Sequence, residues 1–210
     1  MIKKFFIKVN SVLFFILLFT FLFTKTNYSY FFSFYPAENA ESKVIVITGD
    51  SYAGYLAGFE CYKDYNFLIY ADAGKSTKEN FDMMKEAVNA YPDTVIISLG
   101  VNDHNKHEKP EDFSNRIEEL ILMCKENQKR VILHTYMIYD DDEFDGSKSI
   151  YTVMDYDDEL KRLGKKYSNA FYIDMSDYNN EIFWQEDRIH YNKLFYDELY
   201  SRISTALMLF

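Results

Sequence analysis

The chain has 210 residues, 48% hydrophobic and 27% charged, which is the composition of a folded protein and not of a disordered one. Without its apolar N-terminus, about 170 residues remain, enough for one domain with its own core. The formal net charge is −10, and residues 41–210 alone carry −13, so phosphates repel this part and we exclude nucleic acid as a partner.

The N-terminus carries the pattern of an export signal. The basic residues 1–8 precede an almost wholly apolar run at residues 11–24, which Lys25 ends. A positive flank before a short apolar core is typical of secretory signals, and the run is shorter than the roughly 20 residues that a membrane span prefers. Two interpretations stay open: a signal peptide cleaved near Ala40, or a retained membrane anchor within residues 1–25. In both, the protein is extracytoplasmic, either secreted or bound to the membrane.

Residues 26–42 are predicted to link this segment to a folded domain at residues 43–210. The linker contains an aromatic stretch, residues 27–36, which has two interpretations. It suits the aromatic belt of a membrane interface, or it forms an extended arm packed on the domain.

From residue 43 onward, short apolar runs alternate with helical patterns. Strands are predicted at 43–48, 66–71, 94–99, 130–136 and 170–174. Helices are predicted after Ser51 and at 78–90, 110–127, 153–167 and 191–210. Continuous apolar runs are typical of parallel strands that are covered on both faces. The alternation therefore predicts an α/β fold with a doubly wound sheet of about five parallel strands.

Polar turns follow three of these strands, and a fourth precedes the last helix. They contain Gly49-Asp50-Ser51, Gly74, Gly100-Val101-Asn102-Asp103 and Asp187-Arg188-Ile189-His190. Because functional sites of such sheets lie beyond the carboxyl ends of the strands, we expect these turns to gather at one edge.

The side chains of these turns suit nucleophilic catalysis. A serine hydroxyl is a weak nucleophile and needs an adjacent base, which His190 can provide for Ser51. Asp187 can hold the imidazole in the required tautomer and stabilise its protonated form. The N–H groups of Ser51 and Gly74 and the side-chain amide of Asn102 can donate to a developing oxyanion.

Each of these residues can also be interpreted without a catalytic role. Ser51 is suited to cap a helix, although Asp50 would serve as well. Asn102 suits a turn, and His190 suits the protein surface. We expect Asp103 to brace its loop by hydrogen bonds and not to take part in chemistry.

Taken in order, the four blocks resemble those of the SGNH hydrolases, also called the GDSL esterase/lipase family. The resemblance covers residues 43–210 and implies a flavodoxin-like three-layer sandwich that hydrolyses or transfers ester-linked acyl groups without metal or cofactor. It makes Ser51 the nucleophile, His190 the base and Asp187 its partner, with Gly74 and Asn102 completing the oxyanion hole. The chain departs from the family pattern at Tyr52, where leucine is usual, and at Arg188, where a small residue is common.

The expected function is that of an exported serine esterase, or acyltransferase, acting on small acyl esters. Location and analogy suggest O-acetyl groups on cell-envelope carbohydrate as the substrate. The alternatives are a lipase or lysophospholipase and a non-catalytic scaffold that binds envelope glycans.

No metal site is predicted. His104 and His107 lack a third ligand nearby, and the acidic stretch 140–145 lacks the spacing of a calcium loop. Cys61 and Cys124 are interpreted as two buried thiols in preference to a disulfide.

Three further residues have structural interpretations. We expect His134 to be a satisfied core residue within its strand. Phe183 and Trp184 suit either the wall of a pocket or packing under the last helix.

Overall fold

The computed structural model describes residues 31–35, 43–58, 65–90, 93–134, 151–178, 180–187 and 190–209. These residues form a six-stranded sheet in the order β1-β3-β2-β4-β5-β6. The strands are β1 (Phe31–Tyr35), β2 (Val44–Gly49), β3 (Asn66–Ala71), β4 (Thr94–Ser98), β5 (Arg130–His134) and β6 (Ala170–Ile173). Strands β2 to β6 are parallel, which confirms the five predicted parallel strands, and their order is that of flavodoxin-like sheets.

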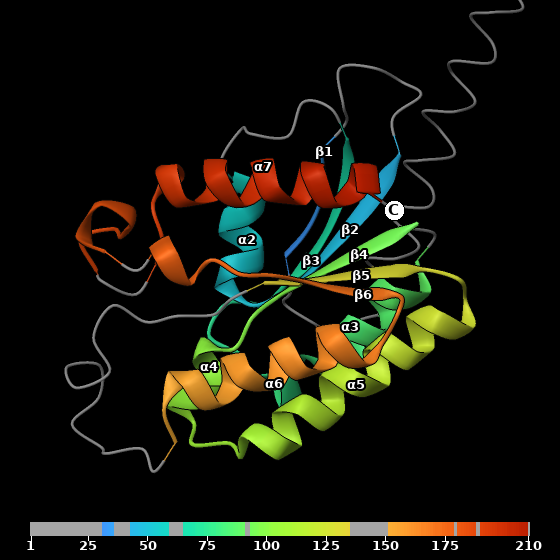
Figure 1. Cartoon of the computed structure of the whole chain (residues 1–210), viewed down its shortest axis with the longest axis horizontal. Helices are drawn as coiled ribbons and strands as arrows, with labels where there is room; N and C mark the ends of the chain where they lie inside the picture. The colour runs from blue at the N-terminus through green and yellow to red at the C-terminus, as the bar shows by residue number, and fades with distance from the viewer. Residues whose placement is uncertain are drawn as a thin grey trace, which may run out of the picture.

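Helices cover both faces of the sheet (Figure 1). One face carries α2 (Ser51–Gly58) and α7 (Lys193–Leu209), and the other carries α3 (Thr77–Asn89), α5 (Pro110–Glu126) and α6 (Val153–Lys166). The shorter elements are α4 (Val101–Asn105) and the 3-10 helices η1 (Ser176–Tyr178) and η2 (Glu181–Phe183), none of which was predicted. The arrangement is the predicted three-layer sandwich.

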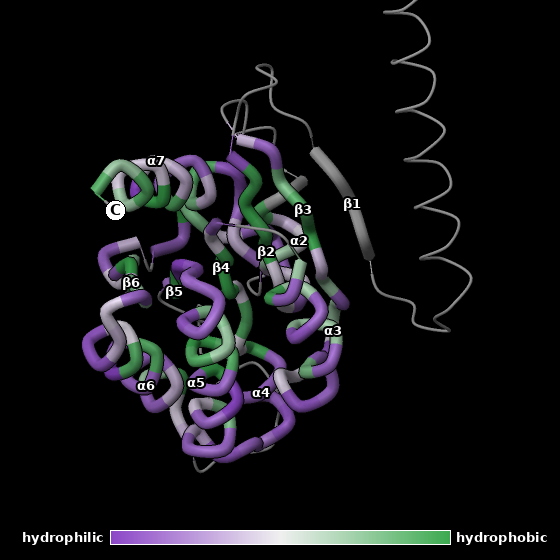
Figure 2. Tube along the Cα trace, turned by 90° about the vertical axis from the view of Figure 1, so that its right-hand side faces the viewer, coloured by the Kyte–Doolittle hydropathy of each residue, from purple (hydrophilic) through white to green (hydrophobic). Residues whose placement is uncertain are grey.

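The strands supply the apolar centre of the molecule: Figure 2 shows hydrophobic residues along β2, β4 and β5, while the surrounding helices mix hydrophilic and hydrophobic residues. In the central strands β2 and β4, every residue except Val44 is buried. This burial on both faces explains why the strands are continuous apolar runs without alternation. Cys124 of α5 also lies in this core as a free thiol, and burial raises its pKa to about 12.

Strand β1 arises from residues that were predicted to form a linker. It pairs antiparallel with β3, from Phe31 opposite Ala71 to Tyr35 opposite Phe67. The aromatic stretch thus includes an extended arm on the domain, as its second interpretation had it. The predicted export segment at residues 1–25, Cys61 and the acidic stretch 140–145 lie outside the described residues. Within the described ranges, no helix has the length and apolar character needed to cross a membrane.

Gly49 closes β2 at a position that only glycine fits. Its φ is +150°, and a Cβ atom placed on it would lie 1.9 Å from the carbonyl oxygen of Ser98 in the neighbouring strand β4. The Asp50 N–H donates to this same carbonyl. The backbones of β2 and β4 thus approach too closely for any side chain at the point where the strand ends and the site begins.

We expect Gly49→Ala to lower the free energy of unfolding by about 3 kcal/mol or more, since it adds both backbone strain and a steric overlap. Gly54→Ala in α2 is the matched control, because a Cβ atom there meets nothing within 4 Å. We expect the control to raise stability by about 0.5–1 kcal/mol. Urea denaturation of both variants checks this, and equal effects would contradict the packing argument.

Candidate active site

Ser51, His190 and Asp187 form a hydrogen-bonded chain at the carboxyl edge of the sheet. The Ser51 Oγ lies 3.0 Å from His190 Nε2, and His190 Nδ1 lies 2.7 Å from Asp187 Oδ2. The other oxygen of Asp187 accepts from the His190 backbone N–H at 2.9 Å, which fixes the turn between the two residues. A neutral imidazole that donates from Nδ1 to the carboxylate can accept the serine proton at Nε2.

The capping role falls to Asp50 and not to Ser51. Asp50 Oδ1 accepts from the Tyr52 N–H at 2.9 Å, at the start of α2. Ser51 is the first residue of that helix, and its hydroxyl is directed to His190. The serine therefore stands at a helix N-terminus, where the helix dipole favours negative charge.

Aromatic rings surround the imidazole. The Tyr55 ring lies 4.7 Å from the His190 ring between centroids, and the Tyr52 ring meets it edge-on at 5.9 Å. Tyr52, which replaces the usual leucine, is buried and also packs against Tyr191. The Trp184 ring packs on Tyr191 at 4.3 Å between centroids, and Tyr191 stacks on Phe195 of α7, so Trp184 takes the packing role under α7.

Asn102 is held beside the serine by Asp50. The residue lies in α4, and its Nδ2 donates to Asp50 Oδ2 at 3.0 Å. This bond uses one of the two amide hydrogens, and the other has no partner among the residues that the structure describes, so it can donate to a ligand. Burial raises the pKa of Asp50 to about 7, although the hydrogen bonds from Tyr52 and Asn102 act in the opposite direction.

Gly74 lies in the turn between β3 and α3 with a φ of +75°, a conformation that favours glycine. A Cβ atom there would meet nothing within 4 Å, so the space above this backbone is open. Its carbonyl oxygen accepts from Lys106 Nζ at 2.9 Å. Within the described residues, neither Gly74 nor Ser51 uses its N–H in a hydrogen bond, so both can donate to a ligand.

A buried polar network joins the Gly74 turn to α4. Asp103 accepts from the Thr77 N–H at 2.9 Å and from the Thr77 hydroxyl, and Arg116 pairs with it at 3.4 Å. These bonds confirm that Asp103 braces the loop. Burial raises the pKa of Asp103 to about 6, against the lowering effect of the Thr77 hydrogen bonds.

Several residues that position the site were not predicted from the sequence. Buried Asn80 of α3 donates to the carbonyls of Gly49 and Asp72, at 3.2 and 3.3 Å, and so connects the ends of β2 and β3. Arg116 of α5 pairs with both Asp103 and Glu108. These residues carry no local signal, because polar residues within amphipathic helices usually face solvent.

The remaining histidines lie apart from this chemistry. His134 Nε2 is 2.9 Å from the Ser98 hydroxyl, which confirms a satisfied core histidine. His104 is buried beside the Tyr151 carbonyl, and His107 is exposed. No group of three or more metal-ligating residues occurs in the described part of the chain. Arg188 lies outside that part.

The buried Asp50 carboxyl makes stability depend on pH. Its pKa is about 7 in the folded chain against 3.8 ordinarily, so the folded state holds its proton more tightly between these values. The protonated Asp50 carboxyl therefore stabilises the folded state at low pH, and this contribution is lost as the pH rises from 3.8 to about 7. We expect the free energy of unfolding of Asp50→Asn, relative to that of the parent, to rise by roughly 3 kcal/mol between pH 4 and pH 8. Urea denaturation across this range checks it, and a pH-independent difference would contradict the assignment.

No family model matches the sequence, and no curated protein sequence is significantly similar to it. Solved structures do match. A GDSL-like lipase from Bacteroides thetaiotaomicron superposes with a TM-score of 0.69 at 16% identity, over 83% of this chain and 92% of that one. An acetylxylan esterase from Geobacillus stearothermophilus superposes with a TM-score of 0.59 at 17% identity, over 76% of this chain and 93% of that one. Another acetyl xylan esterase superposes with a TM-score of 0.61 at 17% identity, over 78% of this chain and 98% of that one. The chain therefore has the fold of the SGNH hydrolases.

Proposed function

We propose that the protein is a serine esterase in which Ser51 is the nucleophile. One observation carries the proposal: the hydrogen-bonded chain from Ser51 Oγ through His190 to Asp187, at distances of 3.0 and 2.7 Å. A serine used only as a helix cap would have no need of this arrangement, and Asp50 already caps the helix.

The reaction begins when Ser51 Oγ attacks the ester carbonyl carbon and His190 Nε2 takes the hydroxyl proton. Asp187 stabilises the imidazolium that forms. The carbonyl oxygen becomes an oxyanion, which accepts hydrogen bonds from the N–H groups of Ser51 and Gly74 and from the Asn102 amide. The intermediate collapses as His190 returns its proton to the leaving alcohol, and an acyl-serine remains.

Water completes the cycle. His190 removes a proton from the water as it attacks the acyl carbon, and then gives that proton back to Ser51 Oγ. The acid leaves and the free enzyme is restored. If a sugar hydroxyl takes the place of water, the same residues transfer the acyl group, and a transferase would use the identical site.

The substrate we propose is a small acyl ester, an O-acetyl group on cell-envelope carbohydrate. Structures similar to this chain include acetylxylan esterases, and two structures of the Geobacillus stearothermophilus enzyme are of catalytic mutants in which a serine or a histidine is replaced by alanine. Export by the N-terminal segment would bring the domain to the envelope. The likeness to a GDSL-like lipase supports a longer acyl chain as the second candidate.

We expect Ser51→Ala to lower the hydrolysis of p-nitrophenyl acetate by the full-length chain at least about 10³-fold, because the nucleophile is lost. Hydrolysis of the acetate, butyrate and octanoate esters in detergent solution measures this. Faster cleavage of acetate than octanoate supports the acetylesterase, and the reverse order supports the lipase.

Ser201→Ala is the matched control for this substitution, since Ser201 is an exposed serine on α7. Its activity should equal that of the parent. Circular dichroism must show that both variants are folded. Retained activity in Ser51→Ala would remove the proposed nucleophile, and an inactive but folded parent would point to a transferase or a scaffold.

Asn102→Ala tests the oxyanion hole. We expect kcat to fall about 10²–10³-fold, because one donor to the oxyanion is lost, while KM changes far less. Asn105→Ala, in the same short helix α4, is the control and should leave kcat unchanged. A change confined to KM would show that Asn102 binds the ground state and does not stabilise the oxyanion.

A further inference from the structure

Strand β1 makes the stretch just after the apolar N-terminal segment part of the sheet. Its five residues pair with β3 along their whole length. Signal cleavage near Ala40 would remove this strand and leave the backbone N–H and C=O groups of β3 unpaired at the sheet edge, which favours aggregation. The pairing therefore argues against cleavage near Ala40, and an uncleaved chain keeps residues 1–25 as an anchor.

The direction of β1 determines which edge of the domain the anchor enters. Phe31, the first residue of β1, lies opposite Ala71 at the carboxyl end of β3, and Ala71 lies opposite Gly49 at the end of β2. The chain thus enters the sheet at the edge that carries Ser51 and Gly74. A parallel β1 would have entered at the opposite edge.

The connection is short. Five residues lie between Lys25, which ends the apolar run, and Phe31, and the six steps along the chain from one to the other span at most about 20 Å. Strand β2 lies two strand spacings from β1, about 10 Å. Ser51 directly follows β2, so a retained anchor would keep it within about 30 Å of the membrane surface.

We propose that the anchor and β1 together hold the active-site edge of the sheet toward the membrane, and that the substrate is an acylated saccharide carried on a membrane lipid. The substrate class rests on the esterase function proposed above, whereas the orientation rests on retention of the anchor, the direction of β1 and the length of the connection.

Exposed apolar side chains are compatible with this orientation but do not determine it. Met154, Ile182 and Leu194 are more than half exposed and lie in α6, η2 and α7. Met154 and Leu194 stand in the first turns of their helices, on the side of the site. Met208 and Leu209, at the far end of α7, are also exposed. The path of the chain is what distinguishes the two edges.

The first test asks whether the segment is retained. The intact mass of the full-length protein extracted from membranes should include residues 1–40. A mature chain that begins anywhere after residue 25 would overturn the proposal, because the anchor would be absent, and one that begins near residue 41 would lack β1 as well.

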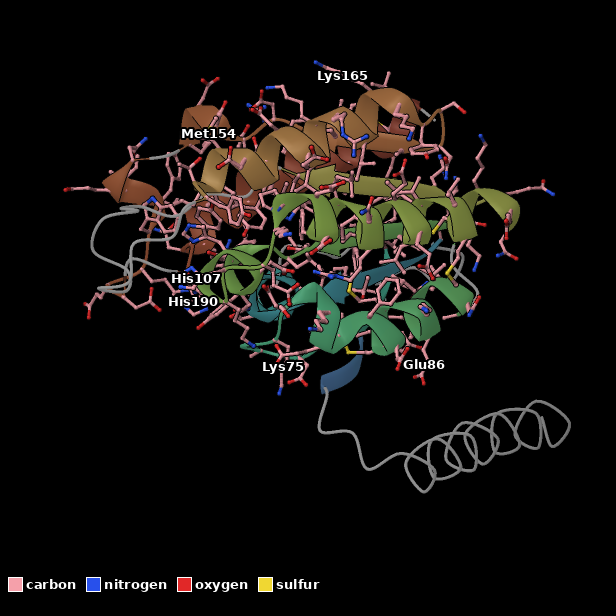
Figure 3. The ribbon with its side chains drawn as sticks, turned by 90° about the horizontal axis from the view of Figure 1, so that it is seen from below. Lys75, Glu86, His107, Met154, Lys165 and His190 are labelled. Atoms are coloured by element: carbon pink, nitrogen blue, oxygen red, sulfur yellow. The ribbon has the colours of Figure 1, made fainter. Side chains whose placement is uncertain are left out.

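The second test measures orientation with two cysteine variants of the full-length chain, Met154→Cys and Lys165→Cys. Both positions are exposed on α6, and Figure 3 shows Met154 at the end of the molecule that carries His190, with Lys165 toward the other end. Position 165 comes eleven residues after position 154, so the two lie about 16 Å apart along the helix axis. Each variant is labelled with a donor dye in phosphatidylcholine–phosphatidylglycerol vesicles that contain an acceptor-labelled lipid.

We expect stronger energy transfer from position 154 than from position 165. The labelled parent chain gives the background from Cys61 and Cys124. Equal transfer, or stronger transfer from position 165, would overturn the orientation. Energy transfer does not depend on catalysis, so this result stands apart from the esterase assignment.

The third test addresses the substrate in the same vesicles. A 20-residue Gly/Ser insertion after Lys25 should lower hydrolysis of an acetylated glucosyl diacylglycerol several-fold and leave hydrolysis of soluble p-nitrophenyl acetate unchanged. Equal rates on the lipid ester with and without the insertion would overturn the proposed substrate placement. If the parent chain hydrolyses neither ester, the result would instead contradict the esterase function.

Discussion

The site depends on one buried carboxyl group, that of Asp50. Its two oxygens accept from the Tyr52 N–H and from Asn102 Nδ2, so a single side chain begins the helix that carries Ser51 and orients the amide beside it. The group is fully buried, and this burial raises its pKa to about 7. Part of the stability of the fold is therefore given up at neutral pH to hold Ser51 and Asn102, the proposed nucleophile and oxyanion donor, in place, as is common at functional sites.

The donors proposed for the oxyanion come from three separate segments, the start of α2, the turn at Gly74 and α4, and the packing between these segments makes preorganisation possible. Asp103 binds Thr77 at the start of α3, and Lys106 donates to the Gly74 carbonyl. Asn80 joins the ends of β2 and β3 below the site. Such bonds hold donors in place before substrate arrives, so little reorganisation is needed when charge develops. The catalytic part is small, but much of the polar interior at this edge supports it.

Strand β1 connects the proposed membrane location to the proposed chemistry. Because it is antiparallel to β3, the chain reaches the sheet at the edge where the site lies. A membrane anchor attached at that point would limit the site to esters near the lipid surface, without any dedicated binding element. The acidic character of the domain, −13 over residues 41–210, would disfavour contact between the rest of the surface and anionic lipids.

The sequence by itself determined the five parallel strands, most of the helices and the four blocks of the site, because these depend on local patterns of apolar residues and on glycines in turns. Only the tertiary structure decided that Asp50 and not Ser51 caps α2, that Tyr52 packs against the catalytic histidine candidate, and that Asn80 and Arg116 support the loops. The same holds for β1, which lies in a predicted linker. Partners such as Asp50 and Asn102 are 52 residues apart in sequence, and no local pattern encodes which distant polar groups meet when the sheet assembles.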